Sequence, residues 1–156
     1  MFWANISYTL NLKYFRNYTN EYNLSDSSNY RTALLRIADA YFLLKDDSLA
    51  IENYANSTLI GDKNHSYALN QIATSQGLIQ DYKGKINTLN KLTIQYPNSK
   101  YQVSSLLNLA QAYKDESRNK ESIDTFLRFI KEYDKIDRKN IGQIFHRRIS
   151  PKAMGL

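Results

Sequence analysis

The chain has 156 residues, of which 42% are hydrophobic, and a formal net charge of +6. This length predicts one domain, and the apolar content is too high for a disordered chain. Cysteine is absent, which excludes disulfide and cysteine–zinc frameworks. No apolar run reaches the roughly 18 residues that a transmembrane helix needs. The few glycines and prolines favour long helices over a turn-rich β fold.

The positive charge is concentrated at one end of the chain. Residues 135–156 contain six basic residues and one acidic residue, so the other 134 residues are almost neutral. A nucleic-acid-binding domain would be expected to show a basic stripe on a defined face. We therefore interpret this segment as a solvated basic tail and expect no specific nucleic-acid partner.

The N-terminal segment predicts one helix over residues 9–22, followed by a polar loop over residues 23–29. The first residues have neither a basic start nor a clean apolar core, so they are not a signal peptide. Leu12, Phe15 and Tyr18 have the same spacing as three apolar residues near the other end of the chain: Ile123, Phe126 and Phe129. A preceding partner helix would lie before Met1 or within residues 2–7, and we expect the chain to begin inside a longer protein.

Three helix–turn–helix units follow, and the third is the clearest. Its first helix has apolar residues at i, i+3, i+4 and i+7, which lie on one helical face. The residues on this face are Leu106, Leu109, Ala110 and Tyr113, and those of its second helix are Ile123, Phe126, Leu127 and Ile130. The first unit repeats the pattern with Leu34, Ile37, Ala38, Tyr41, Ala50 and Tyr54.

The middle unit matches the pattern at Leu69, Ile72 and Ala73 but fits it less well elsewhere. We expect Ala38, Ala73 and Ala110 to be buried where the helices of each pair cross. Gln76 stands where the other units have tyrosine, and Lys85 stands where they have a small residue. Gly77 in a helix interior costs about 1 kcal/mol relative to alanine. We expect this unit to depend on contacts with its neighbours.

The order of a large apolar residue, a small residue, tyrosine, alanine and an aromatic residue resembles the tetratricopeptide repeat family, whose units have about 34 residues. The resemblance implies an all-α, right-handed superhelical solenoid of about three repeats, over residues 31–62, 66–97 and 102–134. Together with a half-repeat in residues 1–22, these repeats form a domain over 1–134. Residues 135–156 then supply a tail and a capping helix at 138–149, whose apolar residues are Ile141, Ile144, Phe145 and Ile149.

The link Tyr96–Tyr101 is similar to those of bacterial periplasmic outer-membrane assembly lipoproteins and TolA-binding proteins. This resemblance implies a fragment of a larger bacterial protein that is periplasmic or associated with the outer membrane. Without it, a cytoplasmic protein is the alternative. The oligomeric state is left open by the sequence.

In this family, the first helices line the concave side of the superhelix. The resemblance therefore implies a partner-binding groove for a peptide or a partner helix, formed by Asp39, Phe42, Tyr67, Asn70, Thr74, Gln111 and Lys114. Phe42 is equally compatible with a core position. Leu35 and Asp39 occupy the positions of the Lys and Asn of the family's carboxylate clamp, so we do not expect binding of chaperone tails.

No catalytic constellation is present in the sequence, and we expect no enzyme activity, cofactor or metal. His65 and His146 are both interpreted as surface residues. The leading hypothesis is a non-enzymatic scaffold for protein–protein interaction. One alternative is a self-assembly segment that docks through the half-repeat with Trp3, Tyr8, Tyr14 and Phe15; another is an accessory domain of a larger enzyme.

Overall fold

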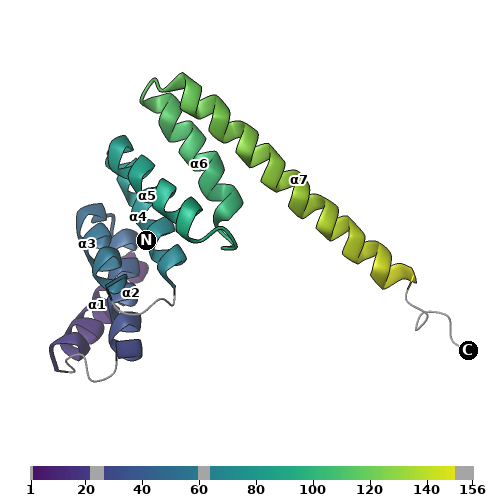
Figure 1. The fold of residues 1–156 in the computed structure, drawn as a ribbon. Coiled ribbons are helices and arrows are strands. Elements are labelled where there is room, and N and C mark those ends of the chain that lie inside the picture. Colours follow the sequence, from purple (N-terminus) through teal and green to yellow (C-terminus); the bar gives the residue numbers. More distant parts are fainter. Residues whose placement is uncertain (1, 22–26, 60–63, 150–156) are drawn as a thin grey trace, which may run out of the picture.

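The computed structural model describes residues 2–21, 27–59 and 64–149, and for residues 2–7, 27 and 140–149 it describes the backbone alone. These stretches form seven helices and contain no strand, which confirms the all-α prediction (Figure 1). The helices are α1 Phe2–Glu21, α2 Ser27–Leu43, α3 Asp47–Ser57, α4 His65–Leu78, α5 Tyr82–Gln95, α6 Gln102–Asp115 and α7 Asn119–Ile149.

Consecutive helices pack against each other along the whole chain. The pairs α2–α3, α4–α5 and α6–α7 correspond to the three predicted helix–turn–helix units. Contacts between α3 and α4 and between α5 and α6 join one unit to the next. The chain is therefore a solenoid of stacked helix pairs, preceded by α1 on the outer side of α2 (Figure 1).

The turn inside each pair has the same backbone conformation. Lys45, Gln80 and Ser117 have φ values of 62°, 59° and 57°. The residue after each of these positions donates its N–H to the carbonyl group five residues earlier, as in a Schellman motif. Glycine is the usual residue at such a position. These three residues carry side chains, so their left-handed backbone conformation has a conformational cost. The tertiary packing of the two helices offsets that cost.

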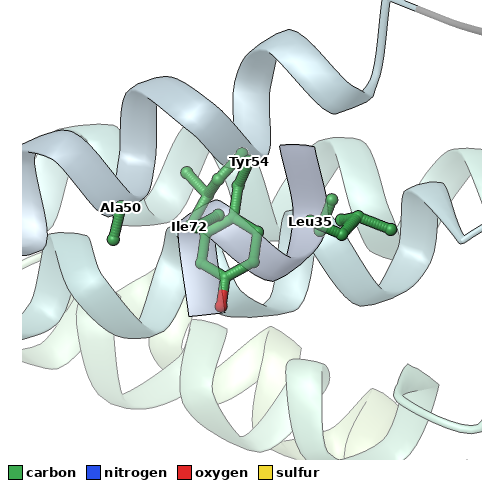
Figure 2. Packing of buried hydrophobic residues seen from close by; sticks show 6 residues of the cluster. Leu35, Ala50, Tyr54 and Ile72 are labelled. Atoms are coloured by element: carbon green, nitrogen blue, oxygen red, sulfur yellow. The ribbon is translucent and has the colours of Figure 1, made fainter. Parts of the chain in front are cut away.

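Two hydrophobic clusters form the core, one at each junction between repeats. The first joins α2, α3 and α4, and Figure 2 shows the ring of Tyr54 among Leu35, Ala50 and Ile72. The second joins α4, α5 and α6 and consists of Ala73, Ile86, Leu89, Leu109, Ala112 and Tyr113.

The small residues predicted at the helix crossings are buried. Ala38, Ala73 and Ala110 have 0%, 1% and 0% of their surface exposed. Ser122 of α7 donates its Oγ–H to the carbonyl oxygen of Ala110 at 2.9 Å. This hydrogen bond requires a close approach of α6 and α7, which a larger side chain at position 110 would prevent.

The structure corrects the sequence prediction at the start of the chain. Helix α1 begins at Phe2, so residues 2–8 extend the half-repeat helix instead of forming a separate first helix. Helix α2 begins at Ser27, inside the segment expected to be a polar loop. The end of the first predicted repeat, at residues 60–62, lies outside the described residues.

The other correction concerns the C-terminal part of the chain. Residues 138–149, expected as a separate capping helix, continue α7 without a break, and α7 runs past α6 and away from the other helices (Figure 1). No glycine or proline interrupts residues 119–141. Within α7, Lys135 forms an ion pair with Glu132, and Arg138 donates to the carbonyl oxygen of Asp134. These local interactions favour helix where the repeat pattern predicted a turn.

We predict that Ala110→Leu lowers the free energy of unfolding by about 1–3 kcal/mol, because the added carbons overpack the crossing of α6 and α7. Chemical denaturation monitored by circular dichroism measures the change. Asn108→Leu, which introduces the same residue at an exposed position of α6, should change stability by less than about 0.5 kcal/mol. Equal stability of Ala110→Leu and wild type would contradict the assigned crossing.

Candidate functional site

A polar cluster around Asp39 joins the first two repeats. Tyr54 of α3 and Tyr67 of α4 both donate their hydroxyl hydrogens to Asp39 Oδ1, at 2.6 and 2.5 Å. Arg36 Nη1 lies 2.8 Å from Asp39 Oδ2. The carboxylate thus receives donors from its own helix and from two neighbouring helices. Both oxygens of this mostly buried carboxylate therefore have partners, and a protein interior accepts a buried charge only when it is paired and hydrogen-bonded.

Burial and the Asp39 carboxylate together keep the two tyrosines neutral. Both effects disfavour a phenolate, and they raise the pKa of Tyr67 to about 12. The pKa of Tyr54, which is fully buried, is raised further for the same reasons. Asp39 therefore has a structural role in addition to any contact with a partner.

Phe42 also contributes to the structure of the first repeat. Its side chain is partly buried and packs against the first hydrophobic cluster, together with Tyr41, Ile51 and Tyr67. The sequence left core and groove as equal alternatives for Phe42, and the contacts place it at the border of the core.

One hollow of the surface lies where α2, the start of α4 and the link before α6 meet. It has a volume of about 570 Å³. The rings of Tyr67 and Tyr101 are 6.3 Å apart on its wall, and the Lys100 ammonium lies 5.1 Å above the ring of Tyr101. We call this hollow the tyrosine pocket; its lining is Leu35, Arg36, Asn64, Ser66, Tyr67, Ser99, Lys100 and Tyr101.

A second, smaller hollow of about 230 Å³ continues along α4. Asn70 and Thr74 line it, together with Lys85 of α5 and Asn108 of α6. Gln111 and Lys114 lie further along α6, both exposed, and Gln111 donates to Asp115 at 2.8 Å. The structure therefore brings Asn70 and Thr74 into one hollow and Tyr67 into the other, whereas Gln111 and Lys114 line neither.

Sequence reasoning assigned only Tyr67 of the tyrosine pocket to the site, and it missed both basic residues and the second tyrosine. Arg36 is one turn before Asp39 on α2, and its exposed guanidinium was not singled out. Lys100 and Tyr101 belong to the link before α6, which was interpreted only through its resemblance to periplasmic proteins. The signal that could have found them is the interval from Ile72 to Leu109, which is two residues longer than the interval from Ile37 to Ile72.

The family comparison matches both outer repeats. The tetratricopeptide repeat model matches residues 32–56, which span α2 and α3, and residues 104–135, which span α6 and the first half of α7. Two of the three helix pairs of this chain therefore match the tetratricopeptide repeat. The middle repeat lies between the matched segments, and its helix pair has the same turn and the same buried alanine as its neighbours.

A comparison with solved structures gives the same fold. Six chains match, and among them is the crystal structure of MamA, with 13% sequence identity and a TM-score of 0.63. The match covers 69% of this tetratricopeptide repeat chain and 61% of the MamA chain. No curated protein sequence matches the chain. The resemblance to periplasmic outer-membrane assembly lipoproteins and TolA-binding proteins remains a prediction.

Two other observations concern the described part of the chain. None of its helices is long and apolar enough to cross a membrane. Across residues 8–21, 28–59 and 64–139, no three His, Asp or Glu side chains are grouped so that they could hold a metal ion.

The tyrosine hydrogen bonds predict a loss of stability in alkali. In the unfolded chain a tyrosine ionises near pH 10, whereas folded Tyr67 ionises near pH 12. The stability that this difference provides is complete below about pH 10 and is lost as the pH rises towards 12. Tyr67→Phe should therefore show a smaller fall in the free energy of unfolding between pH 9 and 11.5 than wild type, measured by urea denaturation. Identical slopes for the two proteins would show that the Tyr67 hydroxyl does not carry this pH dependence.

Proposed function

We propose that this chain is a non-enzymatic scaffold that binds a protein partner in the groove formed by α2, α4 and α6. Tetratricopeptide repeats generally mediate protein–protein interactions, and proteins of this family are typically scaffolds rather than enzymes. The observation that carries the proposal is the tyrosine pocket. It is concave, it has two half-buried aromatic rings, and its lining comes from the first repeat, from the start of the second and from the link before the third.

The chemistry of the pocket favours an extended peptide with an acidic group. Tyr67 and Tyr101 offer flat apolar surface, on which a peptide side chain can be desolvated. Arg36 and Lys100 supply positive charge at the same place. A guanidinium has five N–H donors, so the ion pair of Arg36 with Asp39 leaves donors for a carboxylate of the peptide.

The predicted groove residues fit different parts of this proposal. Asn70 and Thr74, in the adjacent hollow, can bind the peptide backbone through amide and hydroxyl groups. Gln111 and Lys114 are one or two turns away on α6 and would contact only a longer peptide. Asp39 and Phe42 line neither hollow. Asp39 supports the groove by accepting the hydroxyl hydrogen of Tyr67, and Phe42 supports it by packing against the first hydrophobic cluster.

A second candidate function, self-assembly through the half-repeat, is favoured by a small hollow between α1 and α2. It has a volume of about 210 Å³, and Tyr14, Phe15 and Tyr18 line it. Tyr14 is 67% exposed. This apolar surface lies at the opposite end of the solenoid from α6, so the two proposals can be separated by mutation. The side chain of Trp3 lies outside the described residues.

We predict that Lys100→Ala combined with Tyr101→Ala weakens peptide binding by at least about tenfold, because one charged and one aromatic contact are lost. Peptides selected from a displayed random library, and then titrated by calorimetry, supply the measurement. Lys91→Ala combined with Ile94→Ala is the matched control, since it removes one lysine and one large apolar residue from the exposed side of α5.

The same peptides test the groove residues predicted from the sequence. Asn70→Ala with Gln111→Ala should weaken binding by about 1–3 kcal/mol if either side chain leaves a buried peptide group unpaired. The melting temperature should be nearly unchanged. If none of these variants affects binding while deletion of residues 1–22 abolishes it, the groove proposal fails and assembly through the half-repeat is the better account.

A further inference from the structure

Helix α7 has an apolar face that nothing in the described structure covers. Ile123, Leu127 and Ile130 lie at i, i+4 and i+7, which places them on one side of the helix. They are 59%, 61% and 52% exposed, whereas Ser122 and Thr125 on the adjoining side are buried against α6. We call these three residues the α7 stripe. In a stack of helix pairs, the first helix of each repeat packs on this side of the second helix of the preceding repeat.

The sequence contains a segment with the pattern of that covering helix, but the structure carries it away from the α7 stripe. Ile144 lies 35 residues after Leu109, the same interval as between Ile37 and Ile72. Because α7 is one continuous helix, position 145 is 18 residues beyond position 127, or about 27 Å along the axis. Residues 138–149 therefore cannot cover the α7 stripe of their own chain.

The charges of α7 determine how a second copy would lie against it. Residues 119–134 contain three basic and four acidic residues, whereas residues 135–149 contain five basic residues and one acidic residue. A parallel pair of α7 helices would bring the two strongly basic halves together. An antiparallel pair places each basic half beside a slightly acidic half, which is electrostatically favourable.

We propose that two copies of this chain associate through antiparallel α7 helices, so that residues 138–149 of each copy cover the α7 stripe of the other. The covering helix of the repeat stack is thereby exchanged between two copies, as in domain swapping. If position 127 faces position 145, then position 134 faces position 138. This register places Asp134 opposite Arg138 of the second copy, twice by symmetry. The antiparallel arrangement places the two repeat stacks at opposite ends of the helix pair.

Sedimentation velocity of the full chain over a range of concentrations tests the association. Wild type should form a dimer, and Leu127→Lys with Ile130→Lys should weaken it at least tenfold because two apolar contacts are replaced by like charges. The matched control is Leu59→Lys with Ile94→Lys, which makes the same changes at positions that are 81% and 71% exposed elsewhere. A wild-type chain that is monomeric at every concentration would overturn the proposal, and so would equal weakening by the control.

The absence of native cysteine allows the arrangement itself to be tested by disulfide formation. A mixture of Leu127→Cys chains and Phe145→Cys chains should form disulfide-linked dimers under mild oxidation, whereas neither variant should do so alone. Dimers formed by Leu127→Cys alone would indicate a parallel pair and overturn the antiparallel arrangement. A chain with both substitutions should give dimers linked between chains. A disulfide within one chain would show that residues 138–149 fold back as a cap, which would also overturn the proposal.

Discussion

The carboxylate of Asp39 is the acceptor on which the joining of the first two repeats depends. Asp39 belongs to α2 and accepts hydrogen bonds from Tyr54 of α3 and Tyr67 of α4, so a single side chain links three helices. Aliphatic packing at the same junction is not directional, and it would permit small rotations of α4 against α2. The two hydrogen bonds to one oxygen are directional and restrict such rotations. The position of Tyr67 in the wall of the tyrosine pocket therefore depends on a residue outside the lining, because Tyr67 donates its hydroxyl hydrogen to Asp39.

Much of the fold could be predicted because its determinants are local and periodic. Ala38, Ala73 and Ala110 occupy equivalent positions, and each was predicted to be buried from its place in the repeat pattern. Features that depend on two residues acting together could not be predicted. Gly77 and Lys85 were each interpreted as a departure from the pattern, but a side-chain carbon at Gly77 would lie 3.2 Å from Lys85 Nζ. The two departures from the pattern are therefore neighbours in space, a relation that their positions in the sequence do not reveal.

The candidate site was predicted only in part, for a related reason. Spacing identifies the first helices and their exposed positions, which yielded Tyr67, Asn70 and Thr74. Spacing does not reveal which polar side chains form hydrogen bonds with a neighbouring repeat. Asp39 was therefore expected to contact a protein partner, whereas it accepts hydrogen bonds from Tyr54 and Tyr67 of its own chain. Lys100 and Tyr101 come from the longer link, whose course no periodicity specifies. The continuity of α7 is a similar case, because helix-favouring interactions within residues 132–138 prevailed over the repeat pattern.

The packing of each helix mainly against its neighbours in the chain also has a consequence for how the protein folds and opens. Contacts close in sequence are formed with little loss of loop entropy, so folding should be fast for a chain of this size. Such a molecule has no single nucleus that all parts require, and unfolding can begin at either end of the stack. The middle helices α4 and α5 have neighbours on both sides, although their sequence departs most from the repeat pattern. The weakest repeat thus occupies the most protected place, and fraying at α1 or at the far end of α7 can occur without loss of the groove.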